Sequence, residues 1–332
     1  MRHVPRLPWW LRLPLRFVAL LGAVSIITFV LVGLSPIDPV QANVGQAAYL
    51  AMSAQKRAAL AEYWGAGRPV LERFGSWLAG ALRGDFGYSL RFNAPVVTVV
   101  GERLASSGAL LAVAWLLSGA LGFALGLVAG ARRGTAVDRV IKAVCYALTA
   151  TPAFWLGLLF LMVFAVGLGW FPIGFAAPIG MAARDVDALS RLHHLVLPAI
   201  VLSLTGIAPV ALHTREKCID ALQSDYMRFA ASRGEGEGSA LFRHGLRNIA
   251  LPAITLHLAS IGELFGGSIL VEQVFSYPGL GQAAVTAGLG GDAPLLVGIA
   301  LASAMLVFAA NALADGLALL LDPRMRKEVR HA

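Results

Sequence analysis

Residues 104–131, with the sequence LASSGALLAVAWLLSGALGFALGLVAGA, contain no Asp, Glu, Lys or Arg. A helix needs about 20 apolar residues to cross the hydrocarbon core of a bilayer, so this stretch is long enough for one span. Five further apolar stretches lie at residues 17–34, 143–170, 195–212, 249–275 and 294–321. Exposed strands would leave backbone groups unpaired in lipid, and these runs are too long and continuous for the strands of a barrel. We therefore predict an all-α, polytopic membrane protein with six transmembrane helices.

The composition supports a membrane protein. Of the 332 residues 58% are hydrophobic and only 14% are charged, and the mean hydropathy is +0.71. A soluble domain would carry about 25% charged residues, so a water-soluble enzyme is excluded. The net charge of +8 is explained by Lys and Arg in cytoplasmic loops and does not indicate nucleic-acid binding. Cys145 and Cys218 are far apart, so neither a disulfide framework nor a metal finger is expected.

The basic residues also predict the orientation. Most of the 27 Lys and Arg residues fall in alternate segments between the spans, as expected when those segments are cytoplasmic. These residues are Arg2, Arg6, Arg12 and Arg16; Arg132, Arg133, Arg139 and Lys142; Arg215, Lys217, Arg228, Arg233, Arg243 and Arg247; and Arg324, Arg326, Lys327 and Arg330. Six spans then place both termini, including the tail 323–332, in the cytoplasm.

Residues 1–34 are predicted to form the N-terminus and the first span. Val40-Gln41-Ala42 loosely resembles a signal-peptide cleavage site. The preceding apolar run is long for a signal peptide, and Pro36 and Pro39 lie close before the site, so an uncleaved helix is favoured.

The external loop, residues 35–103, precedes a transmembrane core over residues 104–322. Within the loop Ser53 is a candidate cap for a helix that runs to about Trp64, and a second helix is expected over residues 69–82. Five apolar residues share one face of that second helix, which should lie on the membrane surface or pack on the bundle: Val70, Phe74, Trp77, Leu78 and Ala81.

Small residues mark a helix contact in the second span. Gly122, Gly126 and Gly130 follow one another at four-residue spacing. Small residues on one face let helices approach closely in lipid, so we expect this face to pack against another span.

The cytoplasmic loop over residues 214–248 carries the strongest functional signal. It contains Asp-Tyr-Met-Arg-Phe-Ala-Ala-Ser-Arg-Gly at 225–234 and Leu-Phe-Arg-His-Gly-Leu-Arg-Asn at 241–248, followed by Leu251-Pro252. This pattern resembles the inner-membrane permeases of dipeptide, oligopeptide and nickel ABC importers, with Ala230, Gly234 and Pro252 at the family's spacing. The resemblance extends over nearly the whole chain through residues 84–89, 132–134, 151–157, 194–198, 272–281 and 322–324.

The resemblance implies a type I ABC importer permease (MetI-like) fold in the bacterial inner membrane. It implies that two short helices of the loop dock on an ATPase subunit, so that closure of the ATPase pair moves the spans as rigid bodies. The coupling residues it implies are Asp225, Tyr226, Arg228, Ala230, Ala231, Gly234, Phe242, Arg243, His244 and Arg247. One departure is Glu235-Gly236-Glu237-Gly238-Ser239, an acidic and flexible stretch that is expected to weaken a helix at this point.

The chain is predicted to be a non-catalytic subunit without a cofactor. None of its four lysines belongs to a G-x-x-x-x-G-K-[ST] motif, so ATP must bind another chain. The implied partners are a second homologous permease, two ABC ATPase subunits, an external binding protein and membrane lipid. The implied cargo is a di- or oligopeptide, with nickel or a metal chelate as the alternative. A secondary transporter and a channel are weaker alternatives, because no repeat, filter or charged ring is evident.

Two further features concern polar groups at membrane depth. His193 and His194 are adjacent and point about 100° apart on a helix, so a metal site is not expected. Glu263 lies near the middle of the fifth predicted span and shares a helical face with Ser260 and Gly267. An intramembrane carboxylate avoids lipid, so this face is interpreted either as the wall of a substrate path or as a tight helix contact.

Overall fold

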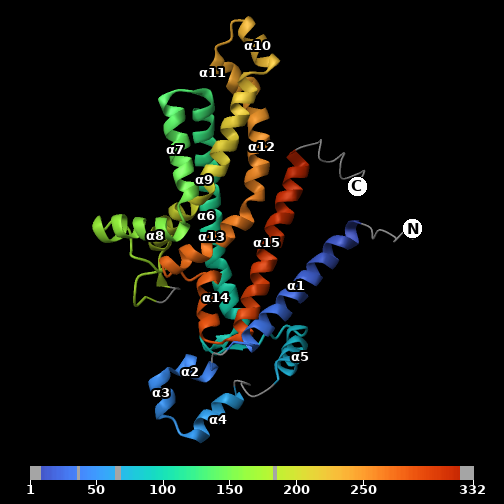
Figure 1. Ribbon diagram of the computed structural model, residues 1–332, viewed down its shortest axis with the longest axis vertical. Helices are drawn as coiled ribbons and strands as arrows, with labels where there is room; N and C mark the ends of the chain where they lie inside the picture. The colour runs from blue at the N-terminus through green and yellow to red at the C-terminus, as the bar shows by residue number, and fades with distance from the viewer. Residues whose placement is uncertain (1–8, 36–37, 64–68, 182–184, 322–332) are drawn as a thin grey trace, which may run out of the picture. The chain divides into compact units, whose positions relative to one another are not determined.

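The computed structural model describes residues 9–35, 38–63, 69–181 and 185–321, and helices dominate this part of the chain (Figure 1). Four helices are long and apolar enough to cross a membrane, and two bent helix pairs bring the number of candidate spans to six. The membrane-spanning, helical prediction is confirmed. Arg2, Arg6, Pro36, Trp64 and the whole tail from Asp322 lie outside the described residues, so the orientation of the termini stays a prediction.

The chain divides into two compact units. The first comprises residues 1–106 and 279–308. Its elements are α1 (Trp9–Gly33), α2 (Pro39–Val44), α3 (Gln46–Ala51), α4 (Ala54–Tyr63), α5 (Val70–Ala81), the antiparallel pair β1 (Tyr88–Ser89) and β2 (Ala94–Pro95), the start of α6 (Val96–Ala131), α14 (Leu280–Leu289) and the first part of α15 (Ala293–Leu321).

Both helices predicted in the external loop are present in this unit. The hydroxyl of Ser53 accepts a hydrogen bond from the N–H of Lys56 at 3.3 Å and caps α4. Helix α5 packs on α1, where the ring of Phe29 contacts Phe74 and Trp77 at centroid distances of 5.3 and 5.4 Å. The apolar face of α5 therefore packs on a membrane helix, one of the two predicted outcomes.

The second unit comprises residues 107–278 and 309–332. It holds the rest of α6, α7 (Ala136–Ala150), α8 (Ala153–Phe160), the π-helix η1 (Leu161–Gly167), α9 (Ala188–Leu222), α10 (Asp225–Ser232), α11 (Glu237–Ala240), the π-helix η3 (Leu241–Gly245), α12 (Leu246–Ala259) and α13 (Ile261–Val274). Helices α7, α8, α12 and α13 all pack against α9, which is the centre of this unit (Figure 1).

The glycine face of α6 packs against α9, as predicted. A Cβ atom at Gly126 would lie 2.5 Å from the carbonyl oxygen of Ala211, and one at Gly130 would lie 2.5 Å from the Cβ of Cys218. Gly122 is similarly close to Val210. The two backbones approach so closely that no larger residue fits between them.

The third predicted span, residues 143–170, is sharply bent. Helix α7 and the helix formed by α8 and η1 meet at an angle of 106°. The break lies at Thr151-Pro152, where Thr151 adopts extended dihedrals of φ −100° and ψ 125°. A residue before proline disfavours the helical conformation, and Pro152 has no N–H to continue the helix.

The fifth predicted span, residues 249–275, is also bent. The pair formed by residues 237–259 and 261–274 bends by 51° at Ser260. The carbonyl of His257 accepts hydrogen bonds from the N–H of Ser260 at 3.2 Å, from its hydroxyl at 2.8 Å and from the indole of Trp115 at 3.1 Å. This carbonyl is diverted from the regular helical ladder, which accounts for the bend.

The fourth helix is longer than the predicted span. Helix α9 continues through Arg215 to Leu222, so the first part of the predicted loop 214–248 is helical. Arg215 lies in the packed part of α9 because its charge is neutralised by the buried carboxylate of Asp138.

Candidate coupling site and membrane path

The segment between α9 and α12 folds as a small helical unit with its own core. Met227 and Ala230 of α10 pack against Ala240 of α11, and Leu222 and Leu241 close the cluster. Ala230 is only 3% exposed. It therefore packs inside this unit and is not on the surface that a partner would contact.

Gly234 ends α10 in a Schellman motif. Its N–H bonds to the carbonyl of Ala231 at 2.9 Å, and the N–H of Glu235 bonds to the carbonyl of Ala230 at 3.2 Å. Gly234 has φ +83°, a conformation that residues with a Cβ adopt only at a cost. No heavy atom lies within 4 Å of a Cβ built at this position, so Gly234 is needed for the turn and not for a close approach within this chain.

The acidic stretch, which we predicted to weaken a helix, contains only the start of a four-residue helix, α11. Helix α11 begins at Glu237, whose carboxylate lies in the first turn, where the helix dipole favours negative charge. Glu235 contacts the Nε2 atom of His244 at 3.1 Å, which ties the turn to η3. Burial of Ala240 and Leu241 in the shared core stabilises this short helix.

Three aromatic side chains of this unit are exposed: Tyr226, Phe229 and Phe242. Phe229 is 63% exposed, Phe242 is 76% exposed, and Tyr226 lies on the same helix as Phe229. Asp225 and Arg228 form an exposed ion pair on α10 at 2.7 Å. Large exposed aromatics with interspersed charges are typical of a protein-binding surface. The remaining predicted coupling residues Ala231, Arg243 and Arg247 are also exposed.

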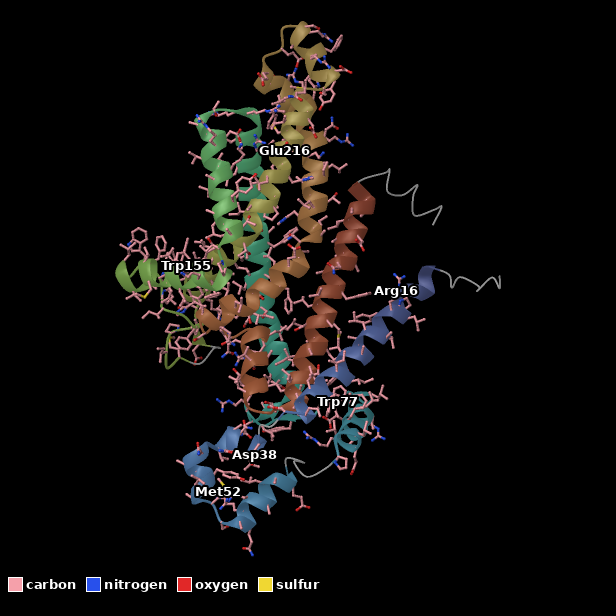
Figure 2. All side chains as sticks on the ribbon, viewed as in Figure 1. Arg16, Asp38, Met52, Trp77, Trp155 and Glu216 are labelled. Carbon is pink, nitrogen blue, oxygen red and sulfur yellow. The ribbon has the colours of Figure 1, made fainter. Side chains whose placement is uncertain are left out.

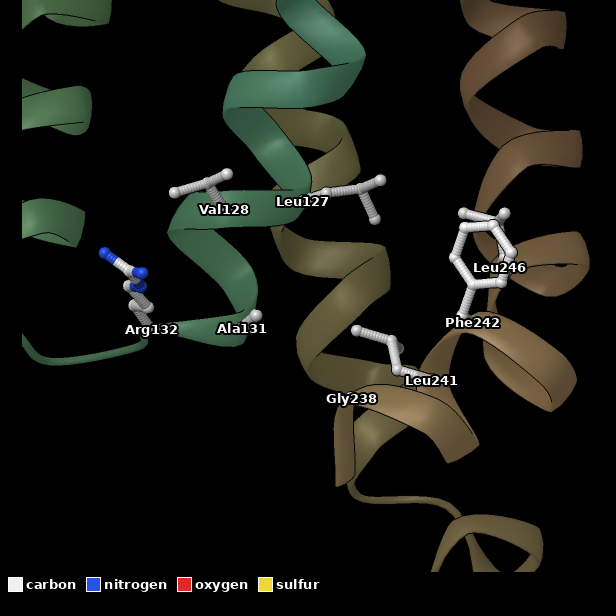
Figure 3. A pocket seen from close by; sticks show the side chains of 8 residues that line it. All are labelled: Leu127, Val128, Ala131, Arg132, Gly238, Leu241, Phe242 and Leu246. Atoms are coloured by element: carbon white, nitrogen blue, oxygen red, sulfur yellow. The ribbon is translucent and has the colours of Figure 1, made fainter. Parts of the chain in front are cut away.

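An apolar cavity of about 250 Å³ lies between the end of α6 and the helical unit (Figure 3). Leu127 lines it from α6, and Leu241, Phe242 and Leu246 line it from η3 and α12. Because Leu241 also belongs to the core that holds α10, any movement of this unit changes the packing against α6.

A buried ion pair holds α7 to the C-terminal half of α9. The guanidinium of Arg215 contacts both carboxylate oxygens of Asp138, with Nε–Oδ1 at 2.6 Å and Nη2–Oδ2 at 2.9 Å. Asp138 is 1% exposed and also accepts the N–H of Gly134 at 2.9 Å. This bidentate geometry fixes both helices a short distance before α10.

The predicted path residues lie around the bend of the fifth span. Glu263 is exposed in the first turn of α13, and Gly266 is exposed beside it. The hydroxyl of Ser260 is bonded back to His257, and a Cβ at Gly267 would lie 3.5 Å from Leu202 of α9. Of the three predicted path residues, only Glu263 has an exposed side chain.

Other polar groups of the membrane helices are engaged inside the second unit. Glu272 is buried and accepts a hydrogen bond from Ser107 at 2.6 Å. His257 stacks on Trp115 with centroids 4.5 Å apart, and its Nε2 atom contacts the Trp115 carbonyl at 2.9 Å. His193 and His194 contact the backbone carbonyls of Trp170 and Gly174. Among the described residues, no group of three or more His, Cys, Asp and Glu side chains is placed to hold a metal ion.

Comparison with known proteins adds to this geometry. Residues 122–327 match the family of the binding-protein-dependent transport system inner membrane component. The chain belongs to this family. The oligopeptide transport system permease protein AppB of Bacillus subtilis is 33% identical over 316 residues, which cover 95% of this chain and 98% of the relative. A putative peptide permease of Brucella suis is 33% identical and a probable peptide ABC transporter permease of Sinorhizobium fredii is 31% identical, each over 93% of this chain and 96% of the relative.

This permease is therefore a multi-pass protein of the bacterial inner membrane and a subunit of an ABC importer. Its relatives are membrane components of such transporters, and no enzyme family is indicated.

Three features of the permease were not predicted from its sequence. Phe229 is the large exposed aromatic of α10, and its position between charged Arg228 and small Ala230 offered a signal for it. The pairing of Asp138 with Arg215, and of Trp115 with His257, joins residues far apart in the chain, and no local pattern predicts either.

Proposed function

We propose that this permease forms half of a translocation path for peptides and is driven by ATPase subunits that bind the helical unit at residues 223–245. The observation that carries the proposal is the unit itself: a short exposed helix, α10, is fixed to α9 and to α12 through two apolar clusters that share Leu222 and Leu241. A force that an ATPase subunit applies at Phe229 would move α9 and α12 together, because packed elements move as rigid bodies.

The partners follow from this role. An external binding protein delivers the peptide, two ATPase subunits bind on the cytoplasmic side, and a second homologous permease completes the path. Peptide as cargo is supported by the relatives, which include an oligopeptide and two peptide permeases.

Glu263 is proposed to face this path. A carboxylate at membrane depth costs on the order of 2.5–3.5 kcal/mol when it faces lipid, so an exposed Glu263 needs a polar surrounding. A water-filled path between two permeases supplies it, and the free ammonium group of a peptide is a suitable partner there. A hydrogen bond between subunits is the competing role.

The test is uptake by the complete importer reconstituted in liposomes. We expect uptake of labelled di- or oligopeptide that requires hydrolysable ATP and the binding protein. Uptake of Ni²⁺ or of a nickel chelate without peptide uptake would assign the permease to the alternative cargo. Uptake that proceeds without ATP would contradict an ATP-driven importer and support a secondary transporter or a channel.

A further inference from the structure

Helices α6 and α12 are joined by a reciprocal pair of hydrogen bonds between Trp115 and His257, which we call the clasp. The indole N–H of Trp115 donates to the carbonyl of His257 at 3.1 Å, and Nε2 of His257 lies 2.9 Å from the carbonyl of Trp115. A carbonyl oxygen only accepts, so Nε2 carries the proton and donates it. The two rings stack with an interplanar angle of 11°. The clasp therefore fixes one turn of α6 against one turn of α12.

The surroundings of His257 indicate that its two hydrogen bonds are the reason for a histidine at this position. The residue is 7% exposed, and its Nδ1 atom is buried without a hydrogen-bond partner in the part of the chain that the structure describes. A buried polar atom without a partner costs free energy, and an apolar side chain of similar size would avoid that cost. A Cβ atom at Gly119 would lie 2.5 Å from Nε2 of His257, so the glycine one turn after Trp115 leaves room for the imidazole.

The clasp sets the direction in which span five continues. The carbonyl of His257 is occupied by the indole of Trp115 and by the N–H and hydroxyl of Ser260. Helix α12 ends at this point, and α13 begins at Ile261 after the bend of 51° (Figure 1). Glu263 is the third residue of α13, so its position depends directly on the bend.

The first turn of α13 is also held from behind. Leu264 is 3% exposed, and a Cβ atom at Gly206 of α9 would lie 3.0 Å from its Cδ1 atom. The same Cβ atom would lie 2.9 Å from the Cβ of Ser118, whose hydroxyl donates to the carbonyl of Trp115 at 3.0 Å. Helices α6, α9 and α13 thus meet behind Leu264, next to the clasp. Glu263 is on the exposed side of the same turn.

We propose that Trp115 and His257 are positioning residues, which hold the Glu263 carboxylate where it meets the ammonium group of a peptide in the translocation path. This inference rests on the proposed function, which places Glu263 at the path. Glu263 lies about 4.5 Å beyond Ser260 along the helix, so a change of about 15° in the bend moves its backbone by roughly 1 Å. A displacement of that size is enough to weaken a site that depends on a fixed geometry.

The first experiment is a double-mutant cycle in peptide uptake by the complete reconstituted importer. Trp115→Phe keeps the aromatic ring and removes the N–H that bonds to His257. We expect at least about a threefold lower maximal rate, because Glu263 is no longer held in place. KM should stay unchanged, because the binding protein captures the peptide before it reaches the path. In the Glu263→Gln background the same change should cause no further loss, since the carboxylate that the clasp positions is already absent.

A tryptophan outside the clasp provides the matched control. Trp77 of α5 (Figure 2) donates a hydrogen bond of the same kind to the carbonyl of Phe86 at 3.2 Å. Trp77→Phe should leave the maximal rate unchanged. Equal fractional losses from Trp115→Phe with and without Glu263→Gln would overturn the inference, and the proposed function would stand if Glu263→Gln alone lowers uptake. Normal peptide uptake in Glu263→Gln would instead remove Glu263 from the path and overturn both proposals for this residue.

A second measurement reports the position of residue 263 without relying on uptake. Glu263→Cys is labelled with a water-soluble methanethiosulfonate in the assembled importer, where the native Cys145 and Cys218 are buried within this chain. Gly119→Ala places a methyl group where the imidazole of His257 lies, and it should change the labelling rate at least about threefold. Trp115→Phe should change the rate in the same direction.

Gly108→Ala is the control on the same helix, because no heavy atom lies within 4 Å of a Cβ at that position, and it should leave the labelling rate unchanged. A labelling rate that neither Gly119→Ala nor Trp115→Phe alters would overturn the positioning role.

Discussion

The buried ion pair between Asp138 and Arg215 gives the sharpest stability prediction. Asp138→Asn removes the negative charge but keeps the shape, so Arg215 stays buried without its bidentate partner. Loss of one member of a buried pair costs about 3–5 kcal/mol. Arg215 also contacts Glu216, whose side chain is largely exposed. In the variant this carboxylate still neutralises part of the Arg215 charge. We therefore expect a loss near the lower end, about 3 kcal/mol, which corresponds to a factor of roughly 100 in the unfolding equilibrium.

A double-mutant cycle measures the pair itself. The free energy of unfolding is obtained by titration with denaturing detergent for the wild type, Asp138→Asn, Arg215→Gln and the double variant. Because the two side chains contact each other directly, the double variant should lose much less than the sum of the single losses. Asp220→Asn, at an exposed site on the same helix, is the control and should have little effect. A coupling energy below about 0.5 kcal/mol would refute the view that this pair joins α7 to α9.

Four further predictions follow from the structure. Gly126→Ala should weaken the contact between α6 and α9 by about 1–3 kcal/mol in the same titration. Gly108→Ala is the control on the same helix and should not destabilise the protein, because no heavy atom lies within 4 Å of a Cβ at that position. Equal effects of the two substitutions would contradict the packing argument. Gly234→Pro should abolish uptake, and Gly234→Ala should reduce it. Gly234→Asn should reduce uptake least, because asparagine tolerates the left-handed conformation best. Wild-type uptake in Gly234→Pro would mean that this turn is not part of coupling. Glu263→Gln should lower uptake of peptide while subunit assembly is retained, and unchanged uptake kinetics would favour the intersubunit hydrogen bond. A topology reporter fused after Ala332 should be active as a cytoplasmic fusion, and activity only outside the membrane would contradict the six-span orientation.

The sequence was sufficient where the signal is local or periodic. Long apolar runs located the membrane helices, the spacing of Gly122, Gly126 and Gly130 identified the face that packs on α9, and Ser53 marked the start of α4. Each of these signals depends on residues within a few turns of one another.

The bends and the long-range pairs could not be predicted in the same way. Thr151-Pro152 was visible in the sequence, but proline also occurs inside continuous helices of this chain, as Pro198 does in α9. The bend at Ser260 depends on the indole of Trp115 from another helix. The loop core explains why Ala230 is buried: the residue faces Ala240, which follows a glycine-rich stretch that we expected to be flexible. Local propensity was overridden in these places by contacts between distant segments.

The central claim, that the exposed face of α10 is where the ATPase drives the permease, is tested most directly through Phe229. This side chain is exposed, so its truncation leaves the core of the helical unit intact. ATP-driven peptide uptake and copurification of the ATPase should be measured for Phe229→Ala, with Leu71→Ala, an exposed apolar residue of α5, as the control. A central aromatic anchor contributes about 2 kcal/mol or more to an interface, so we predict at least about a 30-fold weaker ATPase affinity and a matching loss of uptake, with the control unchanged. Uptake and ATPase binding at wild-type levels in Phe229→Ala would contradict the account.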